Sequence, residues 1–125
     1  MEEKMKKIVI DIDGTLTVSD NSKSYENLEP NQQLIEKLHE YKKMGFTIVL
    51  FTARGMRSQS GDVQRIRTNT QPLIESWLAK HSVPFDELII GKPWCGFDGF
   101  YVDNRSIRPS EFVQKNYNDV LEILE

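Results

Sequence analysis

The sequence lacks the features that mark several classes of protein. Cys95 is the single cysteine among 125 residues, so no disulfide can form within the chain. No apolar run approaches the ~20 residues that a membrane-spanning helix needs. Internal repeats and low-complexity segments are also missing. The sequence therefore argues against a disulfide-stabilised scaffold, a membrane-spanning helix and a repeat array.

Charge and composition are those of an ordinary globular protein. The net charge is −3, with 28% charged and 38% hydrophobic residues. Such a small charge excess gives no reason to expect a nucleic acid or a membrane surface as partner. The first residues, MEEKMKK, lead into an apolar run without the pattern of a signal peptide. We therefore expect a single cytoplasmic domain over residues 1–125, long enough to bury a core.

Short apolar runs alternate with stretches of helical periodicity along the chain. The runs predict strands at 7–11, 46–51, 88–90 and 100–102. Helical spacing is found between Pro30 and Gly45, over 63–80 and after Pro109. This order predicts an α/β fold, a doubly wound parallel sheet of about four strands with helices on both faces.

Two segments leave alternatives open. Pro72 either kinks or splits the helix expected over 63–80, because proline cannot donate a main-chain hydrogen bond. The polar segment 14–30 predicts either a loop or a short hairpin.

The segment from Lys7 to Thr15, KIVIDIDGT, is the most informative part of the chain. Asp11 and Asp13 follow the first strand two residues apart, so both side chains point the same way. The carboxyl end of such a strand opens into the ligand crevice of an α/β sheet. Gly14 allows a sharp turn there. Paired carboxylates attract a divalent cation, and this combination favours phosphate chemistry.

Polar residues also follow each of the other predicted strands. Thr52 ends the second strand and Lys92 follows the third, while Asp103 and Asn104 follow the fourth. Because the carboxyl ends of parallel strands share one edge of the sheet, we expect these groups to converge on Asp11.

With these four motifs the chain resembles the haloacid dehalogenase superfamily of phosphatases. The narrower resemblance is to the short bacterial capsule-biosynthesis phosphatases. It rests on FTAR at 51–54, GKPWCG at 91–96 and RSIRPSEF at 105–112. This resemblance extends over roughly residues 6–124 and implies a Rossmann-like core.

The resemblance implies a role for each motif residue. Asp11 would form an aspartyl phosphate, and Asp13 would act first as general acid and then as general base. Thr52 would bind a phosphoryl oxygen, and Lys92 would neutralise negative charge. Gly14 and Thr15 would offer main-chain N–H groups to the phosphate.

A Mg²⁺ ion is implied as cofactor, held by Asp11, by the main-chain oxygen of Asp13 and by the fourth motif. Many relatives have two acids in that motif, whereas this chain has Asp103 followed by Asn104. An amide oxygen can bind Mg²⁺. We therefore assign Asn104 to the metal, and Asp103 to Lys92 or to a metal-bound water.

No cap domain is expected, because the segments between the motifs are too short for an insertion. An open site either takes a large substrate or is closed by a neighbouring subunit of a homo-oligomer. Ala53, Arg54 and Arg57 follow the second motif and would contact the substrate. The expected function is hydrolysis of a small-molecule phosphomonoester or sugar-linked intermediate of capsule or polysaccharide biosynthesis.

Three other functions share features with this one. A phosphoprotein would also suit an open site. A response-regulator receiver domain has similar acids after its first strand, but it needs an acceptor Asp after a middle strand, where this chain has Thr52. A degenerate, non-catalytic domain of the same superfamily would bind ligands only, yet every motif residue is present here.

Overall fold

The computed structural model describes residues 5–124 of the chain. They divide into two compact units, one ending at Trp94 and the other beginning at Cys95. The single domain expected over residues 1–125 stays a prediction. No helix within residues 5–124 combines the length and the apolar character needed to cross a membrane.

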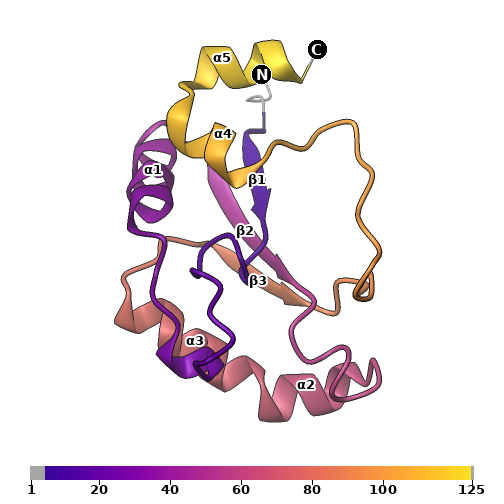
Figure 1. Cartoon of the computed structure of the whole chain (residues 1–125). Helices are drawn as coiled ribbons and strands as arrows, with labels where there is room; N and C mark the ends of the chain where they lie inside the picture. Colours follow the sequence, from indigo (N-terminus) through magenta and orange to yellow (C-terminus); the bar gives the residue numbers. More distant parts are fainter. Residues whose placement is uncertain (1–4, 125) are drawn as a thin grey trace. The chain divides into compact units, whose positions relative to one another are not determined.

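The first unit is built on a parallel sheet of three strands in the order β1-β2-β3 (Figure 1). They are β1 (Lys7–Ile10), β2 (Thr47–Thr52) and β3 (Glu87–Ile90). Ile10 pairs with Leu50, and Thr52 pairs with Ile90. The carboxyl ends of the three strands therefore lie along the same edge of the sheet, as expected for an α/β fold.

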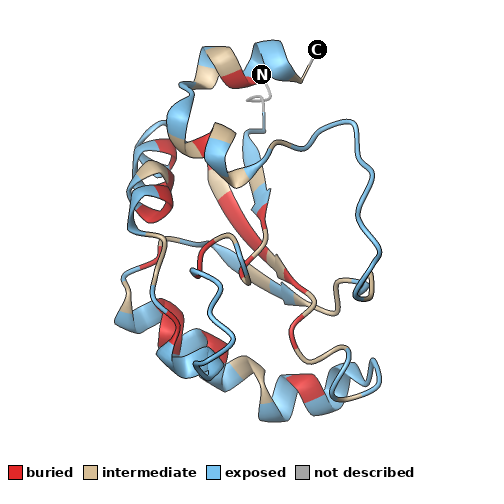
Figure 2. Cartoon of the chain, viewed as in Figure 1, coloured by how far each residue is buried: buried red, intermediate tan, exposed pale blue. Residues whose placement is uncertain are grey.

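The two faces of the sheet are buried to different extents. Ile48 and Leu50 on one face are completely buried. On the other face Val9 is 59% exposed and Ile89 39% exposed. Figure 2 shows buried residues along β2, the central strand, and on the helices of the first unit. The hydrophobic core of the first unit therefore lies mainly against the face that carries Ile48 and Leu50.

The helix α1 (Gln32–Lys43) contacts β2 and covers part of that core. It begins after Asn31, whose side-chain oxygen accepts a hydrogen bond from the N–H of Leu34 at 3.3 Å. It is followed by Gly45, whose φ of 93° suits the left-handed conformation common after a helix. Leu34 and Leu38 are fully buried, as the helical spacing predicts.

Two helices occupy the region where one periodic stretch was expected. They are α2 (Val63–Asn69) and α3 (Gln71–Lys80), separated at Thr70. Of the two alternatives left open for Pro72, the split is therefore the observed one. Pro72 stands in the first turn of α3, where its missing N–H costs no helical hydrogen bond.

The segment between β1 and α1 is largely irregular, as predicted. It contains a short 3₁₀ helix, η1 (Tyr25–Asn27), and an isolated antiparallel bridge between Thr17 and Pro30. The 3₁₀ helix contacts α3. The bridge closes this segment into a loop, residues 17–30, whose ends lie side by side.

The second unit contains α4 (Pro109–Gln114) and α5 (Tyr117–Ile123), preceded by an irregular segment. The fourth strand predicted at 100–102 is wrong: the sheet has three strands among the described residues. Phe100 and Val102 are 78% and 88% exposed. Their local preference for strand structure is not realised because a strand also needs a neighbour to pair with.

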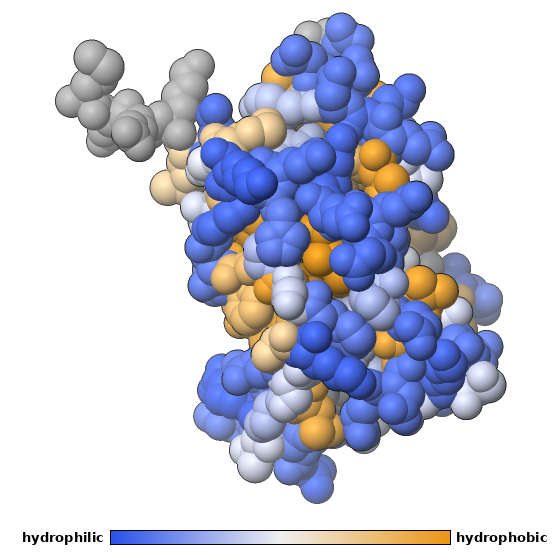
Figure 3. Space-filling model, turned by 90° about the vertical axis from the view of Figure 1, so that its left-hand side faces the viewer, coloured by the Kyte–Doolittle hydropathy of each residue, from blue (hydrophilic) through white to orange (hydrophobic). Residues whose placement is uncertain are grey.

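The surface is mixed in polarity. Figure 3 shows hydrophilic residues over most of one face, with hydrophobic residues scattered between them. Scattered exposed apolar residues are normal on a folded protein and need no functional explanation.

Candidate active site

A tight turn follows β1 and carries the two motif acids. The main-chain oxygen of Ile12 accepts hydrogen bonds from the N–H groups of Thr15, Leu16 and Thr17 at 3.1, 2.8 and 3.1 Å. The side chains of Ile12 and Leu16 are fully buried and anchor the turn. Gly14 has a φ of 80°, a conformation that side-chain-bearing residues rarely adopt. The turn is therefore fixed from both its main chain and its core side.

Asp11 lies at the start of this turn, close to a lysine from another strand end. Lys92 Nζ is 3.8 Å from Asp11 Oδ1, and the hydroxyl of Thr15 donates to Asp11 Oδ2 at 3.2 Å. Burial raises the pKa of Asp11 above its usual 3.8, opposed by the positive charge of Lys92 and reinforced by the negative charge of Asp13. Asp11 is therefore a partly buried carboxylate that faces the ammonium group of Lys92.

The loop after β3 brings Lys92 to this position. Its N–H donates to the main-chain oxygen of Thr52 at 3.1 Å, which extends the β2–β3 pairing beyond Ile90. Thr52 is completely buried at the end of β2. Its hydroxyl oxygen accepts a hydrogen bond from the N–H of Arg54 at 3.1 Å.

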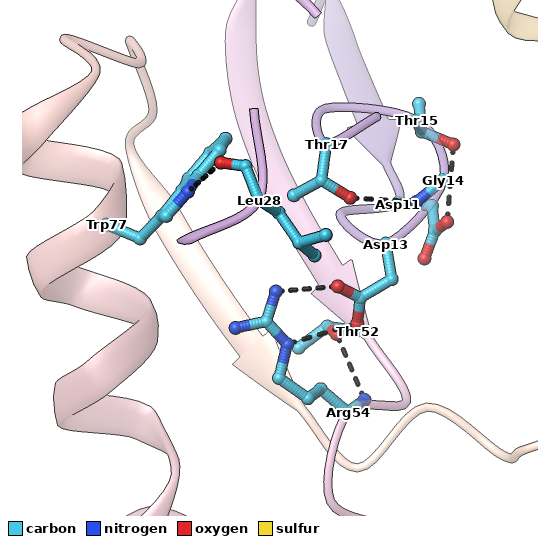
Figure 4. Close-up of polar contacts among 9 residues, drawn as sticks. All are labelled: Asp11, Asp13, Gly14, Thr15, Thr17, Leu28, Thr52, Arg54 and Trp77. Carbon is cyan, nitrogen blue, oxygen red and sulfur yellow. Dashed lines mark hydrogen bonds and ion pairs between the residues drawn. The ribbon is translucent and has the colours of Figure 1, made fainter. Parts of the chain in front are cut away.

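Asp13 is engaged by Arg54 (Figure 4). Arg54 Nε donates to Asp13 Oδ2 at 3.1 Å, and Arg54 Nη2 donates to Asp13 Oδ1 at 2.6 Å. The Arg54 side chain is 4% exposed and that of Asp13 is 33% exposed. The ring of Tyr25 lies over the guanidinium, with its centroid 4.4 Å from Arg54 Cζ.

A comparison with solved structures agrees with the fold. A structural-genomics target protein from Vibrio cholerae is similar over 96% of this chain and 97% of its own, with 49% identity and a TM-score of 0.93. This chain belongs to the same family as that protein. No protein-family model matches the chain, and no curated protein does. The similarity thus shows that the two proteins share a three-dimensional structure, and it names no activity.

Most candidate residues predicted from the sequence in the first unit occupy two neighbouring groups at its strand ends. Asp11 and Lys92 lie together, while Asp13 and Thr52 are linked through Arg54. Of the other two residues expected to contact the substrate, Ala53 lies between Thr52 and Arg54, and Arg57 has its Cζ 5.8 Å from the ring centroid of Trp94.

The N–H groups of Gly14 and Thr15 already have acceptors within the turn. Gly14 N donates to Thr17 Oγ1 at 3.0 Å, and Thr15 N donates to the oxygen of Ile12. The N–H of Asp13 makes no hydrogen bond with residues 5–124. In this turn Asp13, rather than Gly14 or Thr15, therefore offers a main-chain donor to a ligand.

Asp103 and Asn104 belong to the second unit. Asp103 Oδ1 accepts a hydrogen bond from the N–H of Arg105 at 2.7 Å, and this contact forms a local turn. Both residues are exposed. Their assignment to a metal stays a prediction.

The first unit offers oxygen atoms of the kind that Mg²⁺ takes. They are the carboxylate of Asp11 and the main-chain oxygen of Asp13, which accepts no hydrogen bond from residues 5–124. The Asp13 carboxylate is occupied by Arg54. In the described part of the chain no cluster of three or more His, Cys, Asp or Glu side chains could hold a metal ion. The oxygen atoms of Asp11 and Asp13 thus suit Mg²⁺ chemically, but an ion bound to them would need further ligands to complete its coordination.

Sequence reasoning did not foresee the role of Tyr25. It is the only aromatic residue between Gly14 and Pro30, which is a weak signal that this loop packs on something planar. The pairing of Arg54 with Asp13 was missed as well, because it joins the ends of two different strands and leaves no local pattern in the sequence.

Proposed function

We propose that this protein is a Mg²⁺-dependent phosphomonoester hydrolase of the haloacid dehalogenase type that acts through an aspartyl phosphate on Asp11. The observation that carries the proposal is the position of Lys92 Nζ, 3.8 Å from Asp11, with Asp13 two residues farther along the same turn. The substrate is a phosphorylated small molecule or sugar-linked intermediate of capsule or polysaccharide biosynthesis. The core is of the doubly wound, Rossmann-like type without a cap domain.

In the first step a carboxylate oxygen of Asp11 attacks the phosphorus atom of the substrate. A bond forms between this oxygen and phosphorus, and the bond to the leaving oxygen breaks with its electron pair. Partial burial removes part of the water shell of the Asp11 carboxylate, and a less hydrated carboxylate is a better nucleophile toward phosphorus. Lys92 offsets the negative charge that Asp11 and the phosphoryl group bring together.

The other residues of the turn act on protons and on the phosphoryl oxygens. Asp13 supplies a proton to the leaving oxygen, and in the second step its carboxylate accepts a proton from the attacking water. The N–H of Asp13 and the hydroxyl of Thr52 are donors toward the phosphoryl oxygens at the ends of β1 and β2.

Asp11, the main-chain oxygen of Asp13, and Asn104 with Asp103 are the residues that would hold Mg²⁺. When bound, the ion supplies positive charge that neutralises the phosphoryl oxygens during transfer.

The proposal is tested by phosphate release from a panel of small phosphomonoesters, with Mg²⁺ and with EDTA. We expect activity that EDTA abolishes and Mg²⁺ restores, and an acid-stable phosphoryl adduct on Asp11 detected by mass spectrometry. Asp11→Asn should lower kcat by at least ~10³-fold, because the covalent route is lost. Glu36→Gln removes an exposed carboxylate from α1 and should leave kcat unchanged. Normal turnover by Asp11→Asn would overturn the proposal.

A further inference from the structure

The contact between Arg54 and Asp13 is the most constrained polar arrangement at the candidate site. Two nitrogens of one guanidinium donate to the two oxygens of one carboxylate, at 3.1 and 2.6 Å. Such bidentate pairing fixes the plane of the carboxylate as well as its distance. Asp13 is therefore held in one orientation.

Arg54 is itself held from three sides. Its N–H donates to the Thr52 hydroxyl at the end of β2. Its side chain is almost fully buried at 4% exposure, and the ring of Tyr25 lies 4.4 Å above its guanidinium carbon. A buried arginine with this support moves little, so the orientation of Asp13 depends on β2 and on the loop that carries Tyr25.

The acceptor geometry of Asp13 indicates which half of the proposed reaction Arg54 serves. Each oxygen of Asp13 accepts an N–H from Arg54, and the same pairing fixes the direction of the lone pair that each oxygen retains. A group that takes a proton from an attacking water needs an acceptor fixed in this way. The observed geometry thus matches the step in which Asp13 takes a proton from water.

We propose that Arg54 is a positioning residue for the hydrolysis of the aspartyl phosphate, and the inference rests on the function proposed above. In this step the oxygen of a water molecule bonds to phosphorus, and the bond from phosphorus to Asp11 breaks with its electron pair returning to the Asp11 carboxylate. The water proton passes to the Asp13 carboxylate that Arg54 holds. Inorganic phosphate leaves.

Tyr25 extends this arrangement to the loop at residues 17–30. Its ring lies over the face of the guanidinium, whereas Asp13 bonds to the edge. Tyr25 belongs to η1, whose residues Tyr25, Glu26 and Asn27 are all exposed. A shift of this loop would remove the aromatic contact and loosen Arg54, so the loop and the orientation of Asp13 are coupled.

The test separates formation from decay of the phosphoenzyme in the full-length protein. p-Nitrophenyl phosphate is the probe, because its leaving group needs little protonation and the first step then does not depend on Asp13 as an acid. Quenched-flow trapping gives both rate constants. Arg54→Ala should slow the decay by ~10-fold or more and change formation by less than about 3-fold, since a positioned general base contributes ~10²–10⁴-fold.

Further variants distinguish positioning from a structural role. Arg54→Lys, which keeps the charge without the two-nitrogen fork, should give an intermediate decay rate, and it carries the test if Arg54→Ala does not fold. Asp13→Asn should slow the decay, and Arg54→Ala combined with it should add little, because both changes remove one function. Tyr25→Phe should behave like the wild type and Tyr25→Ala should not.

Arg67→Ala removes an exposed arginine from α2 and serves as the matched control with unchanged rates. If the phosphoenzyme forms but decays at the wild-type rate in both Arg54 variants, the inference is wrong and the proposed function stands. The same conclusion follows if formation and decay fall equally. If the wild-type protein forms no phosphoenzyme, the proposed function fails and the inference falls with it.

Discussion

Trp77 Nε1 donates a hydrogen bond to the main-chain oxygen of Leu28 at 2.9 Å, although the two residues are far apart in the sequence. Trp77 and Leu28 are 3% and 7% exposed. The contact ties α3 to the loop at residues 17–30, just after Tyr25. The position of Tyr25 over Arg54 therefore depends on a buried hydrogen bond from α3, a helix that follows β2 in the sequence, whereas the loop precedes β2.

Removing this hydrogen bond should loosen the loop. Trp77→Phe keeps an aromatic ring but leaves the buried Leu28 oxygen without its donor, which should lower the free energy of unfolding by about 1–3 kcal/mol. Denaturant titration measures the loss, and hydrogen exchange should speed up within residues 17–30. Trp94→Phe changes a tryptophan that is 41% exposed and should cost less. Equal costs in the two variants would show that ring volume, rather than the hydrogen bond, is what matters.

The roles of the two acids can be separated by the choice of substrate. Asp13→Asn removes the proton donor, so it should slow the release of alkyl leaving groups by ~10²-fold or more relative to p-nitrophenol in the formation of the phosphoenzyme. Single-turnover rates with a matched pair of alkyl and nitrophenyl phosphates measure this ratio. Equal losses on both substrates would contradict the role of Asp13 as an acid.

The assignment of Asn104 to Mg²⁺ can be checked by titrating the metal. Asn104→Ala should raise the Mg²⁺ concentration needed for half-maximal activity by about 10-fold or more, because an oxygen ligand is lost. The KM for substrate at saturating Mg²⁺ should change much less. Asn118→Ala, at an exposed position on α5, is the control. An unchanged Mg²⁺ requirement in Asn104→Ala would remove Asn104 from the metal site.

Asp86 gives a prediction for the pH dependence of stability. It accepts hydrogen bonds from the side chain of Lys42 and from the N–H of Ile48, and these lower the pKa of Asp86 below its usual 3.8. At a pH near 3.8 and somewhat below it, Asp86 therefore binds a proton more readily in the unfolded chain than in the native protein. Stability from this group is present above pH ~4 and is lost as the pH falls through the native pKa.

Asp86→Asn keeps an oxygen for Ile48 but removes the charge that attracts Lys42. At neutral pH it should lower the free energy of unfolding by less than about 1 kcal/mol, because the pair is partly exposed. The difference from the wild type should disappear once the pH is well below 3.8. Chemical denaturation at several pH values measures it, and a difference that grows on acidification would have the wrong sign.

The three observed strands and α1 could be predicted because their signals are local. Each strand is an apolar run that ends at a polar residue, and α1 has both a capping residue, Asn31, and a terminating glycine, Gly45. The meeting of Asp11 with Lys92 also followed from the sequence, because strand ends share an edge in any parallel sheet.

The remaining features depend on contacts between distant residues, which a single sequence does not reveal. Phe100 and Val102 have the composition of a strand, but pairing decides whether a strand forms. Pro72 marked a break without deciding between a kink and a split. Arg54 is a residue type typical of the surface, yet it is buried, with Asp13 bonded to the edge of its guanidinium and the Tyr25 ring over its face.

The parallel order of the sheet has a consequence for synthesis of the chain on the ribosome. Because no two strands are joined by a hairpin, β1 must wait for β2, about 40 residues later, before its first ladder hydrogen bond can form. During that interval Ile8, Val9 and Ile10 emerge as an apolar segment with no strand to pair with. The same residues that position the two acids in the finished protein are thus exposed to misassociation until β2 has been synthesised.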